Sequence, residues 1–285
     1  MEFREICSTV IKAMFSDDVL MEKLVLKGGN AIDIGYNLGA RASTDVDFSI
    51  SEDFSDLPDI KIRVLRSLTD RFNSIGLLVF DLTLESKPKS SKDPRWGGYR
   101  ICFKLIDETK ANLDATDRQR QAIPVTPPTK GGTQGSSKFR IEISKYEFCE
   151  GYQEREIDHF PIRIYSHEMI VIEKLRALCQ QMPEGGRGEA ITARARDFFD
   201  IYKLITQSKL DLATAPNPSI AAKIFKAKEV PISLLWTLPQ YRDFHRPDWP
   251  SVESSVSGKG KLETFDFYFD FVCKEVDRLK SSWVE

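Results

Sequence analysis

The feature that most constrains this chain is residues 24–50, where a glycine pair is followed by a strand that carries two aspartates. An apolar, β-prone run leads to Gly28 and Gly29, which would end a strand because glycine accepts positive φ and lets a ligand approach the backbone. We predict a helix that begins near Asn30, a good N-cap residue, and ends at Gly39. The unpaired N–H groups of its first turn would form a site for phosphate.

The next strand carries Asp45 and Asp47. A spacing of two places both carboxylates on one strand face, about 7 Å apart, while Val46 and Phe48 point into a core. Carboxylate oxygens are the ligands that Mg²⁺ prefers. A glycine turn alone is usually only a turn, and an Asp-x-Asp pair alone is most often a solvated strand face. Together in one strand–turn–helix–strand unit they predict nucleotidyl transfer, in which a metal ion neutralises triphosphate charge.

A third carboxylate, Glu142, lies in the alternating strand predicted over residues 138–148. A carboxylate within an apolar strand is costly unless it is solvated or paired. Two interpretations remain: an exposed face of an edge strand, or a third metal ligand beside the aspartate pair. We take Glu142 as the third ligand, with Asp81 and Asp107, at the ends of other predicted strands, as the alternatives.

The remaining pattern predicts an α/β (α+β) fold, a mixed sheet with flanking helices followed by a helical C-terminal domain. We place the domains at residues 1–160 and 161–285, with a proline-marked junction at Phe160–Pro161 and the active site in the cleft between them. The last helix has aromatic residues on all sides and is expected to be buried. Helices are predicted over 3–21, 60–75, 166–181, 193–205, 220–230 and 261–279, and a strand hairpin over 77–84 and 99–106.

Composition limits the classes of partner. The net charge of −2 and pI of about 6.1 give no global basic field, so contact with RNA must come from a local patch. Five scattered cysteines and three distant histidines make a zinc site improbable and suit a reducing cytoplasm. We expect no membrane span and no signal peptide. Residues 86–98 form a basic loop, and residues 107–137 begin with a helix and end in a long loop, predicted to be mobile near the acceptor or else disordered.

The stretches Lys27–Ala31 and Arg41–Phe48 resemble the AbiEii/AbiGii-type nucleotidyltransferase toxins, within the superfamily typified by DNA polymerase β. That family usually has Thr where this chain has Asn30, a change that keeps a capping side chain. The resemblance implies a metal-dependent enzyme (Mg²⁺ or Mn²⁺) that moves a nucleotide from an NTP to tRNA, as the toxin of a toxin–antitoxin or phage-defence pair with a cognate antitoxin. It also implies nucleotide contacts from Gly28, Gly29, Asn30, Arg41, Ser43 and Lys174. The resemblance extends to Glu142 as third metal ligand, since a strand of Ile-Glu-Ile character follows the Asp-x-Asp strand.

A second signature lies in two later helices, Glu-Lys-Leu-Arg-Ala-Leu at 173–178 and Arg-x-Arg-Asp-Phe-Phe-Asp at 194–200. By pattern alone, these charges are solvent-exposed helix faces with ion pairs. The family resemblance implies that Lys174 and Asp197 are required. Lys174 would hold triphosphate oxygens, and Asp197 would either position Lys174 or accept the proton of the attacking hydroxyl.

Two alternatives to this function remain at the level of sequence. Within enzymes, the acceptor could be a protein or a small molecule such as an antibiotic. From a different class, the chain could be a non-catalytic module that binds RNA or a partner. The intact carboxylate set argues against the second alternative.

Overall fold

The computed structural model describes residues 2–39, 43, 45–89, 97–125, 135–186, 191–256 and 262–283. The chain divides into two compact units, Met1–Gly35 with Ser43–Ile164 and Tyr36–Ala42 with Tyr165–Glu285. The division lies four residues after the boundary expected at about residue 160, because Phe160 and Pro161 begin a strand of the first unit's sheet. That strand pairs on both sides, and the units divide after it.

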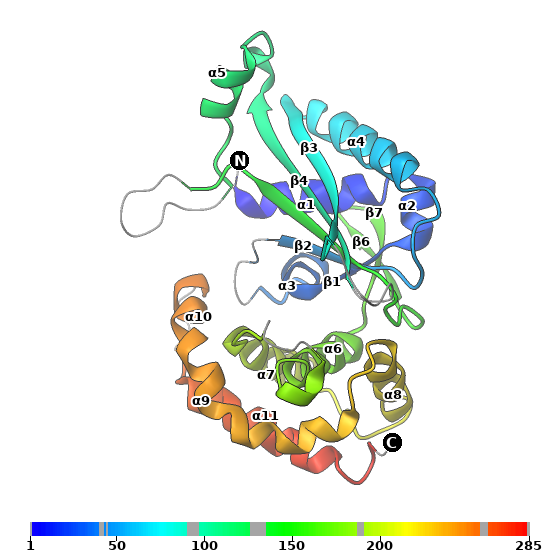
Figure 1. Ribbon diagram of the computed structural model, residues 1–285, viewed down its shortest axis with the longest axis vertical. Helices are drawn as coiled ribbons and strands as arrows, with labels where there is room; N and C mark the ends of the chain where they lie inside the picture. Colours follow the sequence, from blue (N-terminus) through cyan, green and yellow to red (C-terminus); the bar gives the residue numbers. More distant parts are fainter. Residues whose placement is uncertain are drawn as a thin grey trace. The chain divides into compact units, whose positions relative to one another are not determined.

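The described part of the first unit contains a mixed seven-stranded sheet in the order β3-β4-β5-β2-β1-β7-β6 (Figure 1). β1 pairs antiparallel with β2, and β2 pairs parallel with β5. The expected hairpin is confirmed as the antiparallel pair β3–β4, with a bulge near Asp81, but the β6–β7 hairpin was not expected. The strands are β1 Val25–Lys27, β2 Asp45–Ser49, β3 Leu77–Lys87, β4 Gly98–Asp107, β5 Phe139–Ser144, β6 Gln153–Ile157 and β7 Phe160–Ile164.

Strand alternation sets which face of the sheet is buried. Val46 and Phe48 of β2 are fully buried, as are the apolar residues of β5. Rings from successive elements continue this core, with Phe103 5.2 Å from Phe139 and 5.9 Å from Phe72 between centroids. Burying each such side chain contributes about 1.5–3 kcal/mol. The predicted alternation is confirmed, and it leaves the polar residues of β2 and β5 together on the opposite face.

Helices α1 (Phe3–Met14) and α4 (Leu57–Asn73) pack on each other, and α1 also contacts β2. Residues 3–21, expected to form one helix, instead form α1 and the short α2 (Asp18–Lys23). The break is at Asp17, whose carboxylate accepts hydrogen bonds from two N–H groups of α2's first turn and so starts a new helix. The expected polar helix after β4 is confirmed as the 3₁₀ turn Glu108–Lys110 and α5 (Ala115–Arg120).

The glycine segment forms one α-helical turn, α3 (Gly28–Asn30), followed by the π-helical turn η1 (Ala31–Gly35). The predicted limits of this helix are wrong at both ends. Asn30 lies inside the helical segment rather than at its N-cap, because its amide donates to the Asp45 carbonyl, 2.7 Å away. The segment ends at Gly35, where a Cβ would clash with Ile164 Cδ1 at 2.2 Å.

The second unit is helical, with α6 (His167–Cys179) and α7 (Ala195–Ser208) packed together and contacted by the later helices (Figure 1). Ser166 caps α6 as predicted, accepting from the Met169 N–H at 3.2 Å. The last helix packs on α7 as expected and buries Phe265 and Phe269, but Phe267 is exposed although we expected the aromatic residues to be covered on all sides. The other elements are η3 Pro183–Gly185, α8 Asn217–Ala227, η4 Ile232–Tyr241, α9 Arg242–His245, η5 Arg246–Asp248, α10 Trp249–Ser255 and α11 Phe265–Leu279.

Within the described ranges, no helix is long and apolar enough to cross a membrane. All five cysteines lie within the described residues, and none of them forms a disulfide bond. The basic residues Lys92 and Arg95 of the 86–98 loop, and most of the loop expected before residue 137, lie outside the described residues, as does Arg41.

Candidate active site

Strand register brings three of the predicted carboxylates to one face of the sheet. In the parallel pair β2–β5, Asp47 lies opposite Glu142 and Asp45 lies opposite Arg140. Neighbouring strands are about 4.8 Å apart, so in-register side chains are close neighbours. We call the face formed by Asp45, Asp47 and Glu142 the carboxylate face. It lies opposite the buried side of β2 and β5.

Two cations lie in register with Asp47 and Glu142, one on each of the neighbouring strands. Lys27 of β1 lies opposite Asp47, and its ammonium is buried and paired with Glu147 at 3.3 Å. Arg100 of β4 lies opposite Glu142 and donates to its Oε1 from both Nη2, at 2.6 Å, and Nε, at 2.8 Å. The Glu142 carboxylate is therefore held by an arginine on the side away from Asp47.

The glycine turn meets the carboxylate face at Asp47. Gly28 has φ of +71°, and a Cβ there would lie 2.2 Å from Asp47 Oδ2. Only glycine both adopts this backbone and leaves room for the carboxylate. Asn30 donates to the Asp45 carbonyl at 2.7 Å and so joins the turn to β2, while Ser43 donates to the same carbonyl at 3.4 Å from just before the strand. Their predicted contact with triphosphate remains a prediction, as does that of Gly29.

The alternative third carboxylates lie on other strands. Asp81 is at the bulge of β3, and β4 and β5 lie between that strand and β2 in the sheet. Its carboxylate pairs with Lys104 at 2.9 Å. Asp107 ends β4 and accepts from the Thr109 N–H at 3.0 Å. Glu142 is thus the candidate whose strand adjoins β2. Among the described residues, however, no three His, Cys, Asp or Glu side chains are arranged to hold a metal ion.

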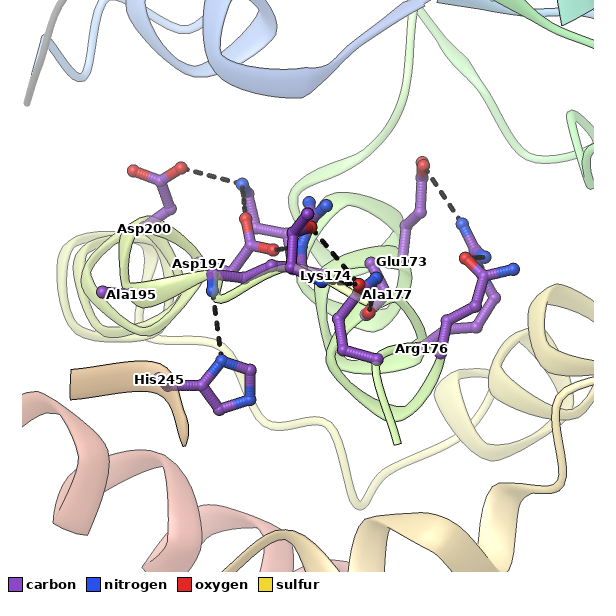
Figure 2. Close-up of polar contacts among 12 residues, drawn as sticks. Glu173, Lys174, Arg176, Ala177, Ala195, Asp197, Asp200 and His245 are labelled. Carbon is purple, nitrogen blue, oxygen red and sulfur yellow. Dashed lines mark hydrogen bonds and ion pairs between the residues drawn. The ribbon is translucent and has the colours of Figure 1, made fainter. Parts of the chain in front are cut away.

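The second signature forms a charge cluster between α6 and α7 (Figure 2). The Lys174 ammonium donates to Asp197 Oδ1 at 2.8 Å and to Asp200 Oδ2 at 2.7 Å. Arg194 donates from Nε to the other oxygen of Asp197. The positive charges of Lys174 and Arg194 thus equal the negative charges of Asp197 and Asp200. We call Lys174, Arg194, Asp197 and Asp200 the buried cluster.

The expectation that these charges lie on solvent-exposed helix faces is wrong, because Lys174, Asp197 and Asp200 are all buried. Burial by itself raises the pKa of Asp197, but Arg194 and Lys174 outweigh it and hold that pKa well below its ordinary value. The Asp197 carboxylate is therefore a charged hydrogen-bond acceptor and a weak base. The structure therefore pairs Lys174 directly with Asp197.

The family of AbiEii nucleotidyl transferase toxins, of type IV toxin–antitoxin systems, matches residues 9–270. The chain belongs to this family. Two solved structures share the fold: a proposed nucleotidyltransferase from H. pylori (16% identity, 99% of this chain and 94% of that chain, TM-score 0.52) and JHP933 from Helicobacter pylori (16%, 98% and 90%, TM-score 0.51). No curated protein sequence matches the chain.

As an AbiEii protein, the chain is a nucleotidyltransferase, of a class that generally uses an NTP and a divalent metal ion. The family also implies an antitoxin partner. Oxygen donors alone line the carboxylate face, which is the donor set that suits Mg²⁺ or Mn²⁺ rather than zinc. Gly28 has no side chain, and the space this leaves for the Asp47 carboxylate is consistent with a site built around that carboxylate.

The AbiEii chain also contains a residue at its second signature that sequence reasoning missed, His245. Its Nδ1 accepts from the Arg194 N–H at 3.1 Å, at the start of α7, and its ring packs on Phe198. Its Nε2 is buried and forms no hydrogen bond with any described residue. Burial lowers the pKa of His245 from 6.5 to about 4, so the ring is neutral. His245 comes 51 residues after Arg194, and no spacing rule in the sequence connects them.

Proposed function

We propose that this protein transfers a nucleotide from an NTP to tRNA in a reaction that depends on a divalent metal ion, and that it acts as the toxin of a toxin–antitoxin or phage-defence pair. The observation that carries this proposal is the carboxylate face. Asp45 and Asp47 share one side of β2, Glu142 lies in register beside Asp47, and Gly28 leaves room for the Asp47 carboxylate.

In this proposal Asp45, Asp47 and Glu142 hold Mg²⁺ or Mn²⁺. A bound ion supplies charge neutralisation for the triphosphate. The backbone at Gly28 and Gly29 gives the triphosphate close approach to N–H groups. The metal-binding role follows from the carboxylate oxygens, and the triphosphate role follows from the side-chain-free backbone of the two glycines.

We assign Lys174 to the triphosphate oxygens and Asp197 to the positioning of Lys174. The pKa of Asp197 lies below its ordinary value, which makes it a poor acceptor for the proton of an attacking hydroxyl. Its hydrogen bond to the Lys174 ammonium instead fixes where that charge lies. Of the two roles left open by the sequence, positioning is therefore the one that the chemistry supports.

The test is incubation of the purified protein with each labelled NTP in turn and with total RNA, purified tRNA or a protein lysate. We expect label in tRNA, dependent on Mg²⁺ or Mn²⁺ and abolished by chelator. Label in protein or in a small molecule would replace tRNA as the acceptor. If no acceptor is labelled, and Mg²⁺ with NTP leaves the melting temperature unchanged, the non-catalytic alternative replaces the enzyme.

Two further parts of the proposal concern the setting. We place the reaction in the cytoplasm, where NTPs and tRNA are found. We also propose a cognate antitoxin that relieves toxicity, which co-expression with the neighbouring gene would test. Growth arrest by this protein alone, and its absence in the Asp47→Asn variant, is the expected result.

A further inference from the structure

The ion pair between Arg100 and Glu142 has an unusual arrangement for a candidate metal ligand. Both N–H donors of Arg100 lie on the same oxygen, Oε1, at 2.6 and 2.8 Å. Among the described residues, no side chain or backbone N–H donates a hydrogen bond to the other oxygen of Glu142. Such charge-assisted hydrogen bonds are among the stronger polar contacts in proteins. Arg100 therefore fixes the direction of the Glu142 carboxylate.

The strand order shows what that direction means. Glu142 is on β5, with Asp47 in register on β2 to one side and Arg100 in register on β4 to the other. A carboxylate held by its β4 neighbour is drawn away from its β2 neighbour. This agrees with the finding that the three carboxylates do not converge as a metal site within the described residues.

We propose that Arg100 competes with the metal ion for Glu142, so that metal binding requires Glu142 to leave Arg100. The inference rests on the proposed function, since it needs the carboxylate face to be the metal site. It makes Arg100 a positioning residue that sets the affinity for the ion. Because the pair is partly exposed, water screens it, and its removal should tighten metal binding by only about fivefold.

The chain offers a matched control in Arg140. This arginine lies on the same sheet face, opposite Asp45 and two positions before Glu142 on the same strand. It forms no ion pair with any residue that the structure describes. Arg140→Gln therefore removes the same charge from the carboxylate face as Arg100→Gln does, but leaves the contact to Glu142 in place.

The experiment is titration with Mn²⁺ alone, followed by the electron paramagnetic resonance signal of the free ion, in the full-length protein. We expect Arg100→Gln to bind Mn²⁺ about fivefold more tightly than wild type, and Arg140→Gln less than about twofold more tightly at 0.15 M salt. In a Glu142→Gln background, the Arg100→Gln and Arg140→Gln variants should bind Mn²⁺ with equal affinity. Arg100→Lys keeps the positive charge but loses the paired N–H donors of the guanidinium. Its Mn²⁺ affinity should lie between those of wild type and Arg100→Gln.

Each outcome decides a different point. Equal tightening by Arg100→Gln and Arg140→Gln would reduce the effect to net charge and overturn the inference. Weaker binding in Arg100→Gln would show that Arg100 orients Glu142 toward the ion, which also overturns it. If Asp47→Asn binds Mn²⁺ like wild type, or wild type binds none, the proposed metal site itself fails. Melting temperatures of all variants, measured without metal, separate these effects from loss of fold.

Discussion

The carboxylate face of the first unit and the buried cluster of the second lie in opposite environments. On the sheet of the first unit, the Glu142 and Arg100 side chains keep 39% and 36% of their surface exposed. Between the helices of the second unit, Asp197 and Asp200 keep only 4% and 2%. Water screens the first pair, whereas the second pair depends on its cationic partners. The same kind of substitution should therefore have different consequences in the two places.

The difference changes how a loss of activity is to be interpreted. On the carboxylate face, a variant can lose a metal ligand while the fold remains. In the buried cluster, removing one partner leaves an uncompensated charge inside the unit, which costs about 3–5 kcal/mol. An inactive Asp197 variant is thus evidence for catalysis only if the protein is shown to be folded. Variants that separate fold from chemistry can sharpen or break this comparison.

The largest effect is expected at Asp47. Asp47→Asn should lower turnover by about a thousandfold, on the order of 4 kcal/mol of transition-state free energy, because a metal ligand is lost. The unfolding free energy should stay constant or rise, since a negative charge leaves a face shared with Asp45 and Glu142. Labelled-NTP assays and urea unfolding measure the two quantities. Glu154→Gln, an exposed change on β6, is the control, and an active Asp47→Asn would refute the metal assignment.

The second prediction concerns Lys174. Lys174→Met should lower the unfolding free energy by about 3–5 kcal/mol, because Asp200 loses its cation inside the unit. Adding Asp200→Leu should recover much of that loss, since Arg194 still balances Asp197. Turnover per folded molecule should nevertheless fall at least about a hundredfold in both variants.

The control for the Lys174 variants is an exposed pair on the last helix. Lys280→Met breaks the ion pair with Asp277, in which both side chains are more than half exposed, and should cost less than about 0.5 kcal/mol. If Lys174→Met costs no more than this control, the cluster is not buried in solution. If its turnover per folded molecule is normal, Lys174 has only a structural role.

Local periodicity was enough to predict the carboxylate face. The side-chain period of two in a strand places Asp45 with Asp47 and separates Glu142 from its apolar neighbours, whatever the sheet topology. The register that sets Glu142 beside Asp47 depends on which strands pair, and the resemblance rather than the pattern pointed to it. The β6–β7 hairpin was missed because Phe160–Pro161 has the composition of a chain break, and only pairing with β1 and β6 makes it a strand.

The burial of the second signature could not be predicted from its pattern. Asp197 and Asp200 are three residues apart and share a helix face, which is equally typical of a solvated surface. What buries them is α6, which supplies Lys174, and the later segment that carries His245. Likewise the last residue of η1, Gly35, lies where Ile164, far along the chain, leaves no room for a Cβ. Such limits come from tertiary contacts that no local window contains.

The third prediction uses His245 to probe the second unit through pH. Its pKa is about 4 in the folded protein against 6.5 when unfolded, so between these values the unfolded state binds more protons. The unfolding free energy should therefore be highest above pH 6.5 and fall by roughly 3 kcal/mol as the pH drops to 4. Asp197, whose pKa is lowered from 3.8, adds its own loss only below this range.

The measurement for His245 is urea unfolding at a series of pH values. His245→Asn places an amide oxygen near the position of Nδ1 and does not titrate, so its stability should change less over this range. His159→Asn removes a fully exposed histidine and should follow wild type. Parallel profiles for all three proteins would mean that His245 does not titrate abnormally, and that the start of α7 is accessible to water.

The smallest effect on turnover, and the finest test of the carboxylate face, comes from two glycines. Gly28 and Gly76 have nearly the same backbone, with φ of +71° and +74°, so alanine should cost each about 1 kcal/mol. The Cβ of Gly76→Ala would meet Glu108 at an ordinary 3.6 Å, whereas that of Gly28→Ala would lie 2.2 Å from Asp47 Oδ2. Only Gly28→Ala must therefore displace the Asp47 carboxylate. Because small misplacements of reacting groups are costly, its Mn²⁺ affinity and turnover should fall at least about tenfold, while Gly76→Ala keeps both. Equal activity in the two variants would show that Gly28 serves the turn alone.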